Sequence, residues 1–325
     1  MTAWLVTGGA GYIGAHVVRE FLDAGMSPVV IDDLSSGIRS FVPEGVPFVE
    51  ASLLDEDALR RVCSAYPLAG IVHLAAYKYA GESVRRPLHT FEQNVAATGV
   101  LYRVAAEHGV RKVVFSSSAA VYGTPDVDVV TEATAKHPQS PYGETKLIGE
   151  WMLADLARAD PEFRFTALRY FNVVGSGDES IYDASPHNLF PLVFRALQAG
   201  ERPRIFGDDY PTPDGSNVRD YVHVRDVAAA HVVAAQRLEQ GVQLEPAYNL
   251  GSGTGVSVAE IMSAIARVTG TPFEPEIAPR RAGDPPRIVA DGTLAARDLD
   301  WAMRHGLDEM VDSAWRASSR NSMVG

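Results

Sequence analysis

The sequence contains one cysteine, fewer basic than acidic side chains, and no long apolar run. Cys63 alone cannot build a disulfide framework or a cysteine-rich zinc site. The 41 acidic and 29 basic side chains give a formal net charge of −12. This balance argues against a general nucleic-acid or anionic-membrane surface, because both need a surplus of Lys and Arg. Any anionic ligand must therefore meet a few placed cations and backbone amides.

Targeting, membrane and metal signals are also missing. No basic segment leads into an apolar stretch at the start, and the longest apolar stretch, around Val227–Ala235, is interrupted by His231. We therefore expect no signal peptide, no membrane span and a reduced, cytoplasmic protein. The 9 histidines include no pair at metal-ligand spacing, so no metal is expected. His73 and His223 are interpreted as satisfied residues at strand ends.

The first half of the chain alternates short β-branched runs with amphipathic helical patterns. This alternation is typical of a parallel sheet with helices on both faces, and it predicts an α/β fold. We expect a Rossmann-type doubly wound parallel sheet with a smaller C-terminal substrate-binding domain. The predicted strands are Trp4–Thr7, Pro28–Asp32, Pro47–Glu50, Gly70–Leu74, Lys112–Ser116 and Phe165–Tyr170. The predicted helices are about Ile13–Leu22, Asp55–Tyr66, Pro87–Glu107 and Pro141–Ala157.

The pattern changes after about Asn172. Turn-rich stretches such as 207–215 and 275–286 interrupt shorter elements, which suits a loop-rich domain that covers a ligand. We predict a cofactor domain at 1–172 and a mainly substrate-binding domain at 173–325, of which part of 221–255 can return to the first domain.

A glycine motif lies between the first predicted strand and the first helix. Gly8 permits a tight exit from the strand, Gly11 lets a pyrophosphate approach the backbone, and Gly14 lets the helix pack closely on the sheet. Amides at that helix start then bind phosphates without a cation. The next strand ends at Asp32, whose carboxylate accepts from both hydroxyls of an adenine ribose and repels a 2′-phosphate. The sequence thus predicts NAD rather than NADP, with Asp33 lining the adenosine pocket.

A tyrosine and a lysine carry the predicted chemistry. Tyr142 and Lys146 are four residues apart at the start of a helix, so they share one face. A phenol titrates near ~10 and is a poor base at neutral pH, but a nearby ammonium and an oxidised nicotinamide lower its pKa. Ser118, at the end of a preceding strand, can hydrogen-bond the same substrate oxygen. This arrangement predicts proton removal from a secondary alcohol while a hydride passes to the nicotinamide.

These motifs resemble the extended short-chain dehydrogenase/reductases, and within them the family of UDP-glucose 4-epimerases. The resemblance runs over nearly the whole chain. The glycine and Tyr/Lys motifs identify only the superfamily, whereas segment 207–226 is far more specific to the epimerases. The matching segments are TGGAGYIG at 7–14, DDLSSG at 32–37, HLAAYKYAGES at 73–83, SSSAAVYG at 116–123, PYGETK at 141–146, LRYFN at 168–172, GDDYPTPDGSNVRDYVHVRD at 207–226, YNLGSG at 248–253 and PRRAGDPP at 279–286.

The resemblance implies interconversion of UDP-glucose and UDP-galactose with bound NAD that returns unchanged. Tyr142 would take the proton of the sugar 4-hydroxyl while the C4 hydride leaves. The transient 4-keto sugar would then turn over in the pocket and receive both back on its other face. Lys146 would tune Tyr142 and hold the nicotinamide ribose, and Ser118 would orient the 4-oxygen. A homodimer is implied as well.

The resemblance also implies two sets of binding residues. Those expected at NAD are Gly8, Gly11, Tyr12, Ile13, Gly14, Asp32, Asp33, Leu34, Ser35, Ser36, Gly37, Ser52, Leu53, Leu74, Ala75, Ala76, Lys78, Asn94, Tyr142, Lys146 and Phe171. Those expected at the UDP-sugar are Ser118, Tyr142, Asn172, Asn188, Leu189, Arg204, Ile205, Phe206, Arg219, Arg281, Asp284 and Ile288. Arginine suits the diphosphate, although Arg219 and Arg281 can instead form ion pairs with Asp220 or Asp284.

The chain departs from the family pattern at several positions. Ser52 replaces the carboxylate that usually holds the adenine amino group, and Ala120 stands where a threonine is usual. Ile288 replaces a tyrosine that often narrows the sugar pocket, and segment 175–186 is shorter than usual. The last two changes lie near the hexose, so they bear on the identity of the sugar and leave the hydride chemistry intact.

Other functions remain open on the sequence. UDP-glucuronate would need another cation, for which Arg287 or Arg195 are candidates, and a UDP-N-acetylhexosamine would need the roomier pocket that Ile288 supplies. A sugar-nucleotide dehydratase needs an Asp-Glu pair where this chain has Ala119 and Ala120. A non-catalytic NAD sensor would be expected to lack Tyr142 or Lys146.

Overall fold

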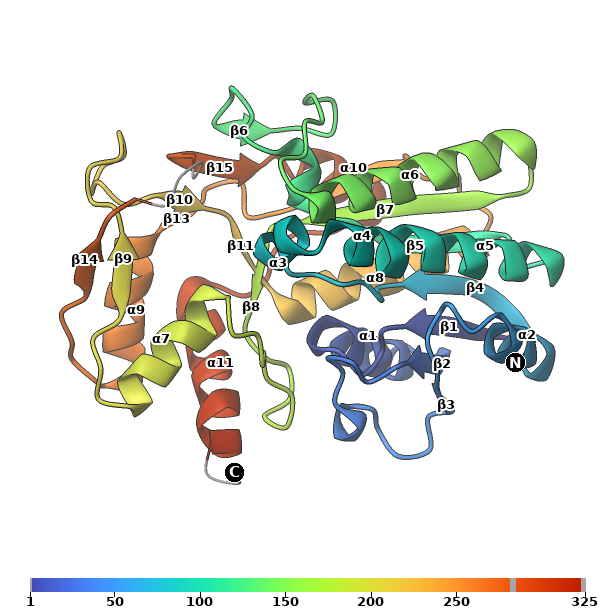
Figure 1. The fold of residues 1–325 in the computed structure, drawn as a ribbon, viewed down its shortest axis with the longest axis horizontal. Coiled ribbons are helices and arrows are strands. Elements are labelled where there is room, and N and C mark those ends of the chain that lie inside the picture. Colours follow the sequence, from blue (N-terminus) through green and yellow to red (C-terminus); the bar gives the residue numbers. More distant parts are fainter. Residues whose placement is uncertain (1, 281–284, 323–325) are drawn as a thin grey trace.

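The computed structural model describes residues 2–280 and 285–322, and its largest feature is a seven-stranded sheet (Figure 1). Its strands all pair in parallel, in the order β12-β7-β5-β4-β1-β2-β3. The chain begins centrally at β1, winds outward through β2 and β3, and crosses back to β4, so the predicted doubly wound fold is confirmed. The strands are β1 (Ala3–Thr7), β2 (Ser27–Asp32), β3 (Phe48–Glu50), β4 (Leu68–His73), β5 (Lys112–Ser116), β7 (Arg164–Tyr170) and β12 (Ala247–Leu250).

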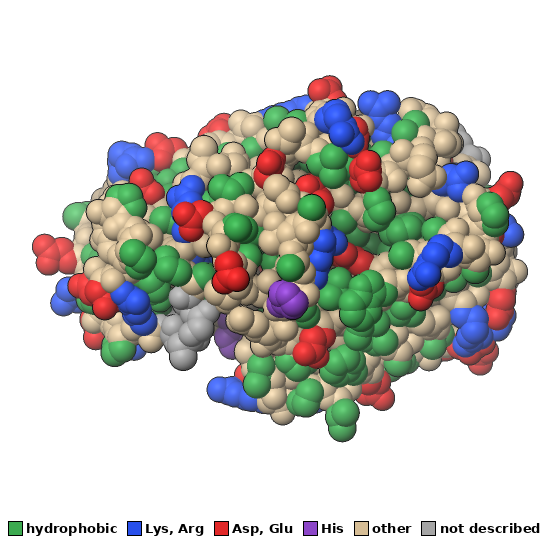
Figure 2. All heavy atoms as spheres, turned by 90° about the horizontal axis from the view of Figure 1, so that it is seen from above, with side chains coloured by type: hydrophobic (Ala, Val, Ile, Leu, Met, Phe, Trp, Pro, Cys, Tyr) green, Lys and Arg blue, Asp and Glu red, His purple; other side chains and the backbone are tan. Residues whose placement is uncertain are grey.

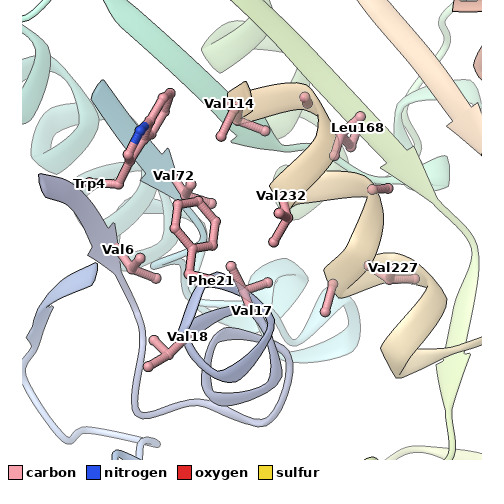
Figure 3. Close-up of a cluster of buried hydrophobic side chains, with 14 of the residues drawn as sticks. Trp4, Val6, Val17, Val18, Phe21, Val72, Val114, Leu168, Val227 and Val232 are labelled. Carbon is pink, nitrogen blue, oxygen red and sulfur yellow. The ribbon is translucent and has the colours of Figure 1, made fainter. Parts of the chain in front are cut away.

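Helices cover both faces of this sheet. On one face, β-strand residues such as Val6 and Val72 pack with Val17 and Phe21 of one helix and Val227 of another (Figure 3). The other face packs against Leu59, Leu101 and Leu153 from three more helices. The first face is covered by α1 (Tyr12–Asp23), α8 (Val224–Glu239) and α10 (Thr293–Leu299), and the second by α2 (Glu56–Ala65), α5 (Ala97–Glu107) and α6 (Pro141–Ala159).

Local capping explains where two of these helices begin. The Asp55 side chain accepts a hydrogen bond from the Ala58 amide at 2.9 Å, and acidic residues follow in the first turn of α2. Ser140 accepts from the Gly143 amide at 3.2 Å, and Pro141 occupies the first turn of α6. The predicted starts of both helices are confirmed to within one residue.

The predicted helix at Pro87–Glu107 is interrupted in the structure. It comprises α4 (Pro87–Phe91), a π-helical turn at Glu92–Ala96, and α5. The periodicity alone did not predict the π-helical turn. Such turns occur frequently at functional sites, and this one carries Asn94.

Two C-terminal elements join the main sheet. Helix α8 packs on it, and β12 pairs with β7 from Ala247↔Ala167 to Leu250↔Tyr170. Both lie within the range 221–255 that the sequence left free to return to the first domain. The assignment of cofactor and sugar to the two predicted domains stays a prediction.

The remaining C-terminal elements form a second group beside the carboxyl ends of the sheet strands, at the left of Figure 1. Their core combines Phe190, Phe194, Ile261, Ile265 and Val311. The helices are α7 (Leu189–Gln198), α9 (Val258–Thr269) and α11 (Leu307–Ser322), and the short strands nearby are β8 (Asn172–Val174), β9 (Arg204–Phe206), β10 (Val218–Arg219), β11 (Tyr221–His223), β13 (Val256–Ser257), β14 (Glu276–Ala278) and β15 (Arg287–Ala290).

Two further elements complete the fold. Strand β6 (Val129–Val130) pairs with β15, and helix α3 (Ala80–Arg85) follows the loop after β4 and contacts α4 and α6. Among the residues that the structure describes, no helix is both long and apolar enough to cross a membrane.

Candidate active site

The glycine motif forms a tight junction between β1 and α1. Gly8 has φ +71°, and a Cβ there would lie 2.7 Å from the Ala75 backbone nitrogen. A Cβ on Gly14 would overlap the Gly8 carbonyl oxygen, so both positions require glycine. Gly11 caps α1 without a side-chain hydrogen bond, and the first turn has no acidic residue. The helix therefore presents its amides and its positive end to an anion, which fits the pyrophosphate of a dinucleotide.

Asp32 lies at the end of β2, beside this junction. Its carboxylate accepts from the amides of Ala10 and Leu34, each at 2.9 Å, and a Cβ on Gly37 would lie 2.6 Å from it. Burial raises its pKa, and the two amide bonds counteract that rise. A carboxylate has about four acceptor positions, so Asp32 can still accept from ribose hydroxyls. Leu34 takes the left-handed conformation at φ 57°, which turns the chain around the carboxylate.

Several other predicted NAD residues have structural partners of their own. Asp33 accepts from the Ser35 amide at 2.9 Å, and Ser52 Oγ accepts from the Leu54 amide at 3.2 Å. The side chain of Leu53 packs in the core, so its backbone is the part left to meet a ligand. The sequence motif located these residues, but their roles toward NAD stay predictions.

Asn94 holds the loop after β4 against α6. Its Oδ1 accepts from the Tyr77 amide at 2.7 Å, and its Nδ2 donates to the Tyr77 carbonyl at 3.1 Å and to Thr145 Oγ1 at 2.9 Å. The loop that bears Lys78 is thereby tied to the helix that bears Tyr142 and Lys146. This positioning role accompanies the NAD contact that the resemblance implies.

Tyr142, Lys146 and Ser118 meet as the sequence predicts. Lys146 Nζ lies 5.8 Å from the centroid of the Tyr142 ring and donates to the Ser116 carbonyl at 2.8 Å. Ser118 and Tyr142 both line the same large cleft, and Ser118 lies close enough to lower the pKa of the Tyr142 phenol. The Tyr142 amide donates to Ser83 Oγ at 3.1 Å, which fixes the start of α6 against α3.

Burial shifts the pKa values of the pair. It raises the pKa of Tyr142, and the interaction with Ser118 counteracts that rise. Burial also lowers the pKa of Lys146 to about 7, against the opposing charge of Glu150. That Lys146 and an oxidised nicotinamide together lower the pKa of Tyr142 stays a prediction.

The sequence analysis missed a buried polar network behind this pair. Glu150 follows Lys146 by one helical turn and forms a two-pronged ion pair with Arg169, through bonds of 2.9 Å from Nε and 2.5 Å from Nη2. Ser117 Oγ donates to Glu150 at 2.5 Å, and Arg169 Nη1 donates to the Tyr122 hydroxyl at 2.9 Å. The position of Glu150 on the face of Lys146 was the available signal, whereas nothing local marked Arg169.

A cleft of about 1820 Å³ lies between the main sheet and the C-terminal group. The predicted residues that line it are Tyr12, Ile13, Lys78, Ser118, Tyr142, Phe171, Asn172, Asn188, Leu189, Arg204, Phe206 and Arg219. It thus brings Ser118 and Tyr142 together with most of the other predicted UDP-sugar residues, while Lys146 lies behind Tyr142. Arg281 and Asp284 lie outside the described residues.

Two predicted sugar-site residues have apolar surroundings instead. Ile205 packs in the C-terminal core, because alternate residues of β9 face opposite sides and the cleft takes Arg204 and Phe206. Ile288 packs against the cluster that contains Val121 and Tyr122.

The cations near the cleft have protein partners. Arg219 Nη1 donates to the carbonyls of Val218 and Pro285, at 2.9 and 2.8 Å, while Asp220 accepts from the amides of Ser252 and Ala290. Arg204 forms an exposed ion pair with Glu276 at 2.9 Å. Both arginines stay within reach of an anion in the cleft, which lowers the electrostatic cost of binding a diphosphate to a chain of net charge −12.

The two strand-end histidines behave as interpreted. His73 is buried between the hydroxyls of Thr7 at 2.8 Å and Thr98 at 2.9 Å, and burial lowers its pKa to about 3. His223 is buried and lies 3.1 Å from Ser313 Oγ. In the described part of the chain, no group of three His, Cys, Asp or Glu side chains is placed to hold a metal.

The cleft wall contains residues that the sequence analysis did not select. Tyr79, Asp183 and His187 line it beside Asn188, whose Nδ2 donates to Asp183 Oδ2 at 2.6 Å. Tyr79 lies inside a motif that was quoted for the family resemblance, but nothing in the sequence indicated that it meets His187.

Comparison with known proteins shows the family of this chain and the proteins that it is similar to. Residues 4–251 match the NAD dependent epimerase/dehydratase family, and the chain belongs to that family. The chain is similar to the UDP-glucose 4-epimerase of Erwinia amylovora, with 41% identity over 98% of both chains.

Solved structures agree with this placement. A crystal structure of UDP-glucose 4-epimerase matches with a TM-score of 0.95 at 39% identity, and covers 99% of this chain and 98% of that one. The Stenotrophomonas maltophila enzyme, crystallised with NAD and formylated UDP-arabinopyranose, matches with a TM-score of 0.94 at 37% identity over all of both chains.

Proposed function

We propose that the protein is a UDP-hexose 4-epimerase, which interconverts UDP-glucose and UDP-galactose with NAD. The observation that carries this proposal is that Tyr142 and Ser118 line a cleft that also presents Arg204 and Arg219, with Lys146 buried 5.8 Å from the centroid of the Tyr142 ring. Similarity at about 40% identity to UDP-glucose 4-epimerases along the whole chain supports it.

NAD fits the residues at the carboxyl edge of the sheet. The amides at the start of α1 would hold its pyrophosphate, and Asp32 would accept from its adenine ribose. Bound there, the cofactor supplies the acceptor for a hydride and its later donor. Lys146 is 4% exposed, and its hydrogen bond to the Ser116 carbonyl holds it at the end of β5 beside Tyr142.

Tyr142 would hold and move the proton of the sugar 4-hydroxyl. Its ring lies at the cleft surface, and Ser118 would share the same sugar oxygen. Arg219 and Arg204 would bind the diphosphate, so the hexose can turn about a fixed anchor and present its other face to Tyr142. The two faces of the 4-keto sugar then give the two epimers.

We also propose a homodimer in the cytoplasm that works in galactose metabolism. The dimer is supported by three exposed apolar residues on contacting helices, Val84 of α3, Leu88 of α4 and Trp151 of α6, which are 61%, 83% and 58% exposed. Figure 2 looks down on the α6 side and shows hydrophobic side chains gathered in one patch. Such patches mark association surfaces.

The activity is tested with purified protein and UDP-galactose, with the products identified by NMR. Formation of UDP-glucose without added reductant is expected. Tyr142→Phe should lower kcat by ~10²–10⁴, because the proton path is lost, while the affinity for UDP stays within about threefold. Near-full activity of this variant would contradict the role of Tyr142, and no conversion by the unaltered protein would contradict the function.

A further inference from the structure

Two aromatic rings meet across the cleft from opposite sides. Tyr79 precedes α3 on the side of the main sheet, and His187 lies in the loop before α7 on the side of the C-terminal group. Their ring centroids are 5.2 Å apart at an interplanar angle of 73°, the edge-to-face arrangement that aromatic pairs prefer. Both residues line the cleft, so the pair narrows it where they meet.

The Tyr79 backbone is tied to the start of α6, where the catalytic tyrosine sits. The Tyr79 carbonyl accepts from the Ser83 amide at 2.8 Å, and Ser83 Oγ in turn accepts from the Tyr142 amide at 3.1 Å. A shift of the Tyr79 backbone would therefore displace Ser83 and, with it, the backbone of Tyr142. The Tyr79–His187 pair is therefore linked to the residue that would act on the sugar 4-hydroxyl.

Tyr79 is also supported from behind. The Tyr77 ring packs edge-on against it at 5.8 Å, and His89 packs edge-on against Tyr77 at 4.9 Å. The backbone of Tyr77 is in turn held by Asn94. Because this row of rings backs the Tyr79 ring, it cannot retreat from the cleft without repacking the row.

We propose that Tyr79 and His187 limit the size of the hexose and so select UDP-glucose and UDP-galactose over UDP-N-acetylhexosamines. This inference rests on the proposed 4-epimerase function. The hexose has to turn over in the cleft, so its substituents sweep past the walls, and an N-acetyl group carries three more heavy atoms than a hydroxyl. Passing the pair would force the rings apart.

The test compares kcat/KM for UDP-N-acetylglucosamine with that for UDP-glucose in four proteins. These are the unaltered chain, Tyr79→Ala, His187→Ala and the double variant. Truncating either ring should raise the ratio by about tenfold, within the discrimination of 10–200-fold that small differences in bulk can give. In the double variant, the increase in this ratio should be smaller than the product of the two single increases. The reason is that each ring restricts the cleft only while the other ring lies across from it.

Tyr79→Phe is the matched control, since it keeps the ring and removes only the hydroxyl. Its ratio of kcat/KM for UDP-N-acetylglucosamine to kcat/KM for UDP-glucose should stay within about twofold of the ratio measured for the unaltered chain. A ratio unchanged in Tyr79→Ala and in the double variant, or raised equally by Tyr79→Phe, would overturn the inference. Binding of both UDP-sugars, read from their protection against thermal unfolding, gives the same comparison without turnover. Failure of the proposed activity and failure of the size limit are thus separable.

Discussion

At the residue scale, the candidate site contains two titratable side chains, Tyr142 and Lys146, whose charged forms are disfavoured by burial. Lys146 is almost fully buried, and its pKa falls to about 7, while burial raises the pKa of Tyr142. A positive charge added beside the pair would lower the pKa of both groups.

The burial of Lys146 predicts a specific dependence of stability on pH. Between its folded pKa of about 7 and its ordinary value of 10.5, the unfolded chain binds a proton that the folded chain does not. The free energy of unfolding therefore rises with pH in this window, relative to a variant without the lysine. Lys146→Met should gain most stability over the unaltered chain below pH 7, and the gain should shrink toward pH 10.5.

Urea unfolding of both proteins at pH 6, 8 and 10 measures this difference, and groups common to both cancel. Two curves that run parallel over the whole range would contradict the low pKa of Lys146.

Residues in local motifs could be predicted from sequence, and residues joined only by the fold could not. The helical spacing of Tyr142 and Lys146 and the glycines after β1 are local patterns that impose their geometry on the backbone. Arg169 reaches Glu150 from a neighbouring strand, and His187 reaches Tyr79 across the cleft. No short window of sequence contains either pair, so sequence periodicity had no means of detecting them.

At the scale of elements, the site depends on how α6 docks onto β5. Lys146 donates to the Ser116 carbonyl, and one turn later Glu150 accepts from Ser117 and from Arg169 of β7. These contacts lie on one face of the helix. These contacts fix the end of β5, and hence Ser118, relative to Tyr142.

Glu150→Gln should therefore destabilise the protein strongly. It leaves the buried Arg169 guanidinium without its countercharge, and breaking such a buried pair costs about 3–5 kcal/mol. Glu107→Gln is the matched control, because Glu107 forms exposed ion pairs with Arg60 and Arg103 that contribute little. Chemical denaturation gives both values, and equal effects of the two substitutions would contradict the role of Glu150.

Element boundaries show a similar contrast. The start of α2 at its Asp55 cap and the start of α6 at Pro141 agree with the sequence. The π-helical turn at Glu92–Ala96 was not predicted, because its residues continue the helical pattern. It arises where Asn94 is drawn to Tyr77 and Thr145, which are tertiary partners.

At the scale of the whole molecule, the cleft lies between the main sheet with its helices and the C-terminal group. Helix α6 and the turn after β5 supply Tyr142 and Ser118, and the C-terminal group supplies Arg204 and Asn188. Neither group holds all of the proposed site.

The proposed homodimer is tested by substitution in its apolar patch. Leu88→Glu combined with Trp151→Glu places two charges where the partner would pack, and should convert a dimer into a monomer. Light scattering after size exclusion measures the mass, with Val242→Glu, on another exposed apolar residue, as the control. A monomeric unaltered protein would contradict the dimer.

The central claim is that a hydride leaves and returns to the same sugar carbon while Tyr142 moves the proton. UDP-galactose that carries deuterium at C4 tests it most directly, with the product examined by NMR and mass spectrometry. The account predicts that UDP-glucose forms with the deuterium still on C4, and that Tyr142→Phe forms it far more slowly. Loss of the label to solvent during inversion would contradict it.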